Sequence, residues 1–138
     1  GHPNCIAPHK RPYHTIIPSM VFKDNKLYLT FGVMGGFMQP QGQVQVLLNI
    51  IDFGMDVQTA LNAPRFRYIA LNNECAFEVG IPDEVLQALA GKGHRVVRLD
   101  DPYSQQFGGG QIIMIHPQTG ALIAGSDPRK DGCAMGIW

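Results

Sequence analysis

The stretch KLYLTFGVMGGFMQPQGQVQVLLNIIDFG, residues 26–54, decides the fold. It opens with an apolar and aromatic run typical of a strand, and this run ends in Gly35 and Gly36. Apolar residues at helical spacing then cover several faces of residues 38–54, which is typical of a helix buried between layers. Pro40 suits the first helical turn, where its missing N–H costs little, and the closing glycine suits the helix end. We therefore predict a strand, a corner without side chains and a buried helix.

The residues before this stretch predict a second strand and an irregular arm. Residues 16–23 are rich in β-branched and apolar side chains, and the turn Asp24-Asn25 would fold them back onto residues 26–31 as a β-hairpin. Residues 1–12 hold three prolines and are expected to pack along another surface without forming a helix or strand.

The residues after the helix predict further short elements. They are a helix capped by Asp56 and ending at Asn62, strands over 65–70 and 75–79, a helix over 82–91, a strand over 94–99, and a hairpin of 111–116 and 121–125. This order is typical of an α+β fold of antiparallel strands with packed helices, not of an alternating parallel one. With 138 residues, of which 45% are hydrophobic, we expect a single domain over 1–138 with its own core.

Composition excludes several classes of partner and site. Lys plus Arg equals Asp plus Glu at 11 each, with no basic stripe, so we expect no nucleic-acid surface. No apolar run approaches the roughly 20 residues of a membrane span, so we expect no membrane partner. Cys5, Cys75 and Cys133 are odd in number and widely spaced, so we predict buried or idle thiols instead of a disulfide framework or a zinc site.

The corner at Gly35 and Gly36 predicts a site for negative charge. Consecutive glycines can take positive φ angles, and their amides can point into one concavity beside the positive end of the following helix. This arrangement would favour an anion that develops during a reaction. The spacing alone also fits a tight turn between strand and helix that binds nothing.

His14 and Thr15 are predicted to lie beside this corner. In a hairpin the start of one strand lies next to the end of the other, so both should approach Gly35 and Gly36 and could contact a substrate. The alternative is that local main-chain bonds satisfy both side chains. We predict no metal site, because no carboxylate accompanies the histidines of the arm.

Glu78 is a charged residue among apolar neighbours. We predict that it forms a structural ion pair with Arg65 or Arg129 instead of acting in catalysis. No Ser-His-Asp set and no reactive Cys-His set is apparent in the sequence.

Several motifs carry a family resemblance over nearly the whole chain. They are KRP at 10–12, FGVMGG at 31–36, NIIDFGMDVQTALNAPRF at 49–66, FEVG at 77–80 and GSDPRKDG at 125–132. In this order they resemble the C-terminal part of the small subunit of γ-glutamyltransferases (γ-glutamyltranspeptidases), including their acylase-like relatives.

The resemblance implies the four-layer αββα fold of N-terminal nucleophile hydrolases and a precursor that cleaves itself. The new N-terminal Thr of the small subunit attacks a γ-glutamyl amide, with its own α-amino group as the base, and water or an amine then takes the acyl group. The paired glycines before the long helix supply the oxyanion hole, which places Gly35 and Gly36 in that role here. The resemblance implies no metal or organic cofactor, and it leaves the compartment open between bacterial cytoplasm and periplasm.

Two departures from the family pattern shape our expectations. The chain begins at Gly1, so we expect the Thr upstream, and we expect this piece to be inactive without the large subunit and the N-terminal part of the small subunit. Where the transpeptidases carry Ser-Ser-Met to hold the substrate α-carboxylate, this sequence has His14, Thr15 and Ile16. Val33-Met34 also stands where the family's glycine turn has Ser-Pro. We therefore expect an acyl pocket lined by His14, Thr15 and Met34, with a small-molecule amide other than glutathione as substrate.

Two functions follow as hypotheses. The first is an amidohydrolase or acyltransferase to which this piece supplies the oxyanion hole. The second is a degenerate, non-catalytic family member that binds a ligand or serves as a scaffold. In either case an isolated piece would expose faces that absent strands should cover, so we expect poor solubility or a homo-oligomer unless a companion chain is present.

Overall fold

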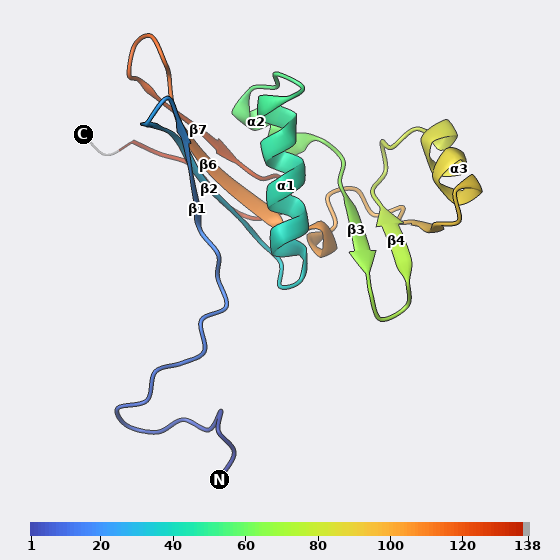
Figure 1. Cartoon of the computed structure of the whole chain (residues 1–138), viewed down its shortest axis with the longest axis horizontal. Coiled ribbons are helices and arrows are strands. Elements are labelled where there is room, and N and C mark those ends of the chain that lie inside the picture. The colour runs from blue at the N-terminus through green and yellow to red at the C-terminus, as the bar shows by residue number, and fades with distance from the viewer. Residues whose placement is uncertain (137–138) are drawn as a thin grey trace.

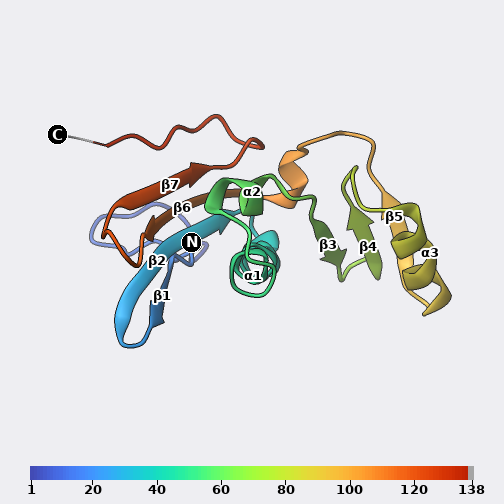
Figure 2. The same cartoon turned by 90° about the horizontal axis from the view of Figure 1, so that it is seen from above.

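A computed structural model describes residues 1–136, and its helix α1 lies between two β-sheets (Figures 1 and 2). The elements in chain order are β1 (Ser19–Lys23), β2 (Lys26–Met34), α1 (Met38–Ile51), α2 (Val57–Asn62), β3 (Phe66–Ile69), β4 (Glu74–Phe77), α3 (Asp83–Gly91), β5 (Arg95–Arg98), a 3₁₀ turn (Gln105–Phe107), β6 (Gly109–Ile115) and β7 (Leu122–Ser126). The arm before β1, residues 1–18, extends away from this body over most of its length (Figure 1), but its last residues are bound to α1 through the carbonyls of Thr15 and Ile17.

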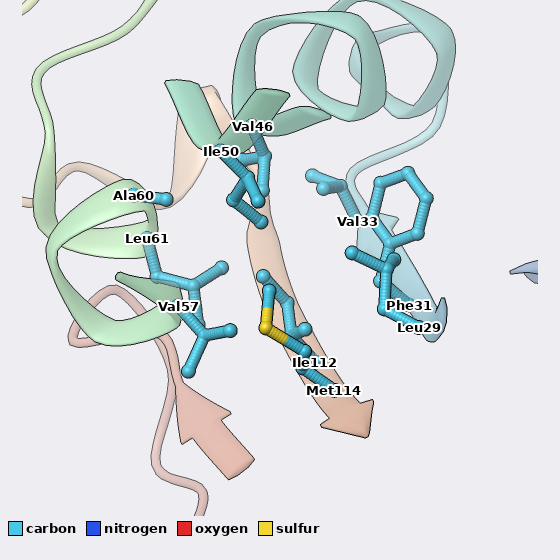
Figure 3. Close-up of a cluster of buried hydrophobic side chains, with 10 residues drawn as sticks. All are labelled: Leu29, Phe31, Val33, Val46, Ile50, Val57, Ala60, Leu61, Ile112 and Met114. Carbon is cyan, nitrogen blue, oxygen red and sulfur yellow. The ribbon is translucent and has the colours of Figure 1, made fainter. Parts of the chain in front are cut away.

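The four-stranded sheet has the order β1-β2-β6-β7, and all of its neighbouring strands are antiparallel. Because side chains alternate along a strand, every second residue of β2 and β6 faces the helices. Figure 3 shows the core that results, made of Leu29, Phe31 and Val33 from β2, Val46 and Ile50 from α1, Val57, Ala60 and Leu61 from α2, and Ile112 and Met114 from β6. This core fixes α1 and the corner before it against β2.

The second sheet, in the order β3-β4-β5, corrects the expectation of antiparallel strands alone. β3 and β4 are antiparallel, but β4 and β5 are parallel. The chain leaves β4 through helix α3 and returns to the starting end of β5, and such a crossover connection produces a parallel pair.

The first strand also differs from its prediction. β1 begins at Ser19, not at residue 16, while β2 continues to Met34. Pro18 has no N–H to donate to the ladder, and the carbonyls of Thr15 and Ile17 accept hydrogen bonds from glutamines of α1 instead. The prediction that His14 and Thr15 begin the paired strand is therefore wrong.

The face of the four-stranded sheet opposite the helices is apolar and exposed. Met20, Thr30, Ile113 and Ala124 are paired in register across the four strands, so their side chains share that face. Met20 and Ile113 are 66% and 44% exposed. Within residues 1–136, no helix combines the length and apolar character needed to cross a bilayer.

The predicted cap of the short helix α2 is confirmed. Asp56 Oδ1 accepts from the amides of Gln58 at 2.9 Å and Thr59 at 3.0 Å, and its other oxygen accepts from the Thr59 hydroxyl. These bonds, the Thr59 hydroxyl foremost, hold the pKa of the Asp56 carboxyl below its usual 3.8. The cap supports the turn that presents Val57 and Leu61 to the core.

Replacing Asp56 with Ala should lower the melting temperature at neutral pH, since two helix amides lose their acceptor. A carboxyl whose pKa is lowered by folding stabilises above its unfolded pKa and ceases to do so as the pH falls through the folded pKa. The difference from wild type, followed by thermal unfolding, should therefore shrink in acid. Asp101→Ala, an exposed loop change, is the control. A difference that persists unchanged in strong acid would contradict the cap as its origin.

Candidate active site

The corner between β2 and α1 turns both glycine carbonyls toward the helix. The Gly35 oxygen accepts from the Met38 amide and the Gly36 oxygen accepts from the Gln39 amide, each at 3.0 Å. Their φ angles are 135° and 58°, a region in which side chains cause strain. The φ of Gly35 therefore requires glycine, and the left-handed φ of Gly36 favours it.

The same geometry leaves the amides of the corner free. In a trans peptide the N–H points opposite to the C=O of the preceding residue. Because the Gly35 carbonyl faces the helix, the Gly36 N–H points away from it. Within residues 1–136, neither the Gly35 nor the Gly36 amide donates a hydrogen bond to a main-chain oxygen, and both residues are exposed.

The positive end of α1 lies next to these amides. The helix has 14 residues, and Phe37 at its N-cap provides no side-chain hydrogen bond. An uncapped helix start of this length carries a partial positive charge that favours an anion. The arrangement can therefore stabilise negative charge that develops beside Gly36.

The start of β6 packs closely against the glycine corner. Met34 pairs with Gly109, and Gly108 has a φ of 77°. A Cβ added at Gly108 would lie 2.4 Å from the Met34 carbonyl oxygen, and one added at Gly35 would lie 3.0 Å from Gly108 Cα. The glycines of residues 108–110 thus allow β6 to pack directly against the corner.

A buried network of two arginines and two carboxylates holds this part of β6. Arg65 Nη2 donates to Asp127 Oδ2 at 2.6 Å, and its Nη1 donates to the Phe107 carbonyl at 3.1 Å. Asp127 Oδ2 also accepts from the Gly110 amide at 2.8 Å. The network therefore forms hydrogen bonds with the main chain before and after Gly109, at Phe107 and Gly110.

The predicted ion pair of Glu78 is the other half of the network. Arg129 Nε donates to Glu78 Oε1 at 2.7 Å, which confirms the structural ion pair, and Glu78 Oε2 accepts from the Arg65 amide at 2.7 Å. Arg129 Nη1 also lies 3.1 Å from Asp127 Oδ1. All four side chains are almost completely buried.

Burial lowers the pKa of both arginines, and the charges around each one decide the direction of its net shift. Burial, reinforced by repulsion from Arg129, lowers the pKa of Arg65, although Asp127 and Glu78 offset part of that effect. Burial opposes the charge of Arg129 too, but hydrogen bonding and attraction from Glu78 and Asp127 prevail and raise its pKa. Because arginine is not deprotonated in proteins, the network sets two cations against the carboxyl groups of Asp127 and Glu78.

Of the predicted pocket residues, the structure brings Thr15 and Met34 toward the corner. Gln39, in the first turn of α1, donates from Nε2 to the Thr15 carbonyl at 2.8 Å. Met34 is about half exposed and lines a groove of about 280 Å³ together with Ile16 and Ile17. His14 precedes Thr15 and is exposed.

Sequence reasoning missed the pair of Arg65 and Asp127 and the bonds made by the glutamines of α1. The ion pair joins residues 62 positions apart, and no local pattern encodes such a contact. The glutamines did carry a signal, since they alternate at 39, 41, 43 and 45, and in a helix this places them as two pairs spaced four residues apart.

Comparison with known proteins identifies relatives of the chain. A sequence model of the family described as gamma-glutamyltranspeptidase matches residues 1–137. The glutathione hydrolase-like YwrD proenzyme of Bacillus subtilis is 35% identical over 145 residues, which cover 99% of this chain and 26% of that protein. The glutathione hydrolase proenzyme of Escherichia coli is 36% identical over 130 residues, which cover 94% of this chain and 21% of that protein.

Solved structures also match the fold of the chain. A crystal structure of cephalosporin acylase from Bacillus halodurans matches with a TM-score of 0.80 at 46% identity, over 96% of this chain and 24% of that chain. The likeness confirms the expected fold class, an α+β part of the fold of N-terminal nucleophile hydrolases. The chain spans about a quarter of the length of these proteins. Because the family model covers nearly the whole sequence, the chain belongs to the gamma-glutamyltranspeptidase family.

Proposed function

We propose that this chain is the C-terminal part of the small subunit of a γ-glutamyltransferase-like amidohydrolase or acyltransferase. The longer protein would cleave a γ-glutamyl or related amide, with an N-terminal Thr outside this chain as its nucleophile. One observation carries the proposal: the amides of Gly35 and Gly36 have no main-chain acceptor within the described residues and lie at the positive end of α1.

The mechanism assigns these amides to the oxyanion. The Thr hydroxyl attacks the amide carbonyl, its proton passes to the Thr α-amino group, and the carbonyl oxygen becomes negatively charged. Gly35 and Gly36 donate hydrogen bonds to that oxygen. Collapse of the intermediate breaks the C–N bond, the leaving amine takes the proton from the α-amino group, and an acyl ester of Thr remains. Water or a second amine then takes the acyl group.

The acyl group would lie along the groove beside the corner. The relatives include glutathione hydrolases and a cephalosporin acylase, so γ-glutamyl and other acyl groups are both candidates. Ile16, Ile17 and Met34 line the groove together with the uncharged amides of Gln39, Gln43 and Gln111. By the family resemblance, His14 and Thr15 occupy the positions where the transpeptidases have serines, but neither of them lines this groove. We therefore propose an acyl group less polar than γ-glutamyl, which carries both an α-amino group and an α-carboxylate.

The exposed face of the four-stranded sheet would be covered by the remainder of the same precursor. Met20 and Ile113 form part of an apolar row across the strands. Burying one such side chain contributes about 1.5–3 kcal/mol, so a second sheet from the rest of the protein would be held there strongly.

The full-length gene product tests the proposal. We expect mass spectrometry to find two chains, the smaller beginning with Thr, and the processed protein to hydrolyse γ-glutamyl-p-nitroanilide or glutaryl-p-nitroanilide. Changing that Thr to Ala should leave a single inactive chain. A single wild-type chain that turns over neither compound would reject the enzyme and favour a non-catalytic binding or scaffold protein.

A further inference from the structure

Helix α1 carries two pairs of glutamines that bind different parts of the chain. Residues four apart in a helix lie on the same side, whereas residues two apart lie on nearly opposite sides. Gln41 and Gln45 therefore form one pair and Gln39 and Gln43 the other. The first pair binds the edge strand β3, and the second binds the arm before β1.

The pair on the β3 side replaces a neighbouring strand. Gln45 accepts from the Phe66 amide and donates to the Phe66 carbonyl, both at 2.9 Å. Gln41 accepts from the Tyr68 amide at 2.7 Å and donates to the Tyr68 carbonyl at 3.1 Å. Alternate residues of an edge strand present their amide and carbonyl outward, and these side chains satisfy both. Gln41 Nε2 also donates to the Phe37 carbonyl of its own helix at 3.3 Å. Neither Gln41 nor Gln45 lines the groove, and both have a structural role.

The pair on the arm side holds one wall of the groove. Gln39 donates to the Thr15 carbonyl at 2.8 Å and Gln43 to the Ile17 carbonyl at 2.6 Å. Gln43 Oε1 also accepts from the Ser19 hydroxyl at 2.8 Å. The arm thus lies against α1 through bonds to alternate residues, in the place where Pro18 prevents strand pairing.

Gln39 connects the arm to the glycine corner. Its amide donates to the Gly36 carbonyl at 3.0 Å, while its side chain holds Thr15. The peptide that follows Gly36 and the wall of the groove are therefore fixed by one residue. Gln39 and Gln43 also line the groove themselves, between Ile16 and Ile17 on the arm and Met34 on β2.

We propose that Gln39 and Gln43 are positioning residues that set the acyl-group specificity of the site by holding the arm as the apolar wall of the groove. This proposal rests on the proposed function. Without these bonds the arm would leave α1, the groove would lose the wall that carries Ile16 and Ile17, and the enzyme would discriminate less between acyl groups.

The test uses Gln39→Met in the full-length, processed protein, with Gln41→Met as the matched control. Both changes remove a glutamine amide from the same helix at similar side-chain length, but only Gln39 binds the arm. We expect Gln39→Met to change the ratio of kcat/KM between γ-glutamyl-p-nitroanilide and glutaryl-p-nitroanilide by about five-fold, mainly through KM. A change of about this size corresponds to the net contribution of one hydrogen bond. These donors differ only in the α-amino group. Gln43→Met should act in the same direction, and Gln41→Met should leave the ratio unchanged.

A second measurement follows the arm without using activity. Chymotrypsin should cut after Tyr13 faster in Gln39→Met than in wild type or Gln41→Met. The protease must bind residues on both sides of the cut, and the bond from Gln39 holds Thr15, two residues beyond Tyr13, against α1. Equal rates of this cut in all three proteins would overturn the proposal. An active wild type with the same donor ratio in Gln39→Met and Gln41→Met would overturn the specificity role alone. A wild type that turns over neither donor would reject the proposed function, and the specificity role with it.

Discussion

Replacing Gly36 with Val is expected to lower the turnover of the full-length, processed enzyme by at least about 100-fold, the typical effect of losing one oxyanion donor. Gly36 has a φ of 58°, which a β-branched residue tolerates poorly. The chain would relieve this strain by rotating the peptide, and the rotation would turn the amide away from the oxyanion. Steady-state kinetics with γ-glutamyl-p-nitroanilide and glutaryl-p-nitroanilide would measure the loss, and it should appear in kcat.

Two variants separate this effect from general strain. Gly120 also has positive φ, at 73°, in the turn between β6 and β7, and within the described chain a Cβ at Gly36 or at Gly120 would meet no atom within 4 Å. Gly120→Val therefore imposes a similar local strain away from the corner and should keep its turnover. Gly36→Asn should keep more activity than Gly36→Val, because Asn tolerates this region of φ. Full turnover in Gly36→Val, with processing intact, would reject the oxyanion role.

The features predicted correctly from sequence are those that neighbouring residues determine. Gly35 and Gly36 follow the end of β2 because the turn into α1 has positive φ angles that favour glycine, and Pro40 lies in the first turn of that helix as expected. Asp56 caps α2 because its carboxylate reaches amides only two and three residues away. Each feature is determined within a few residues, so its residue types predict it.

The features that were missed depend on distant partners. Residues 16–18 have the composition of a strand, but Pro18 cannot pair and the glutamines of α1 take the carbonyl of Ile17. The parallel pairing of β4 with β5 depends on where helix α3 returns the chain, which no residue pattern of either strand encodes. The predicted strand pairing of His14 and Thr15 beside the corner is wrong, because β1 begins only at Ser19. Thr15 is held near the corner by a hydrogen bond from Gln39 to its carbonyl.

The largest effect on stability is expected from Asp127→Leu. Asp127 accepts hydrogen bonds from Arg65, Arg129 and the Gly110 amide, and its side chain is fully buried. Its removal would leave two buried cations facing the single carboxylate of Glu78. Breaking a buried ion pair by removing one partner typically costs about 3–5 kcal/mol. We expect a fall of that size in the free energy of unfolding of the full-length protein, measured by denaturant titration.

Glu74→Ala provides the control for charge removal as such. Glu74 pairs with Arg95 at 3.0 Å, and the Glu74 and Arg95 side chains are 17% and 67% exposed, whereas those of Asp127 and Arg65 are 0% and 1% exposed. Water solvates such a pair in the unpaired state, so its loss should cost less than about 1 kcal/mol. A similar cost for Glu74→Ala and Asp127→Leu would contradict the importance of burial.

The double variant Arg65→Met/Asp127→Leu decides whether the cost arises from an unpaired charge or from lost packing. It removes one cation and one anion together and leaves Arg129 paired with Glu78, so the remaining network is balanced. Replacing both members of a buried pair with apolar residues is often nearly neutral, whereas removing one is not. The double variant should therefore be more stable than Asp127→Leu alone, although it lacks more native bonds. If the losses in free energy of unfolding from Arg65→Met and Asp127→Leu simply add in the double variant, the stabilisation comes instead from the hydrogen bonds of Arg65 and Asp127 to residues 107–110.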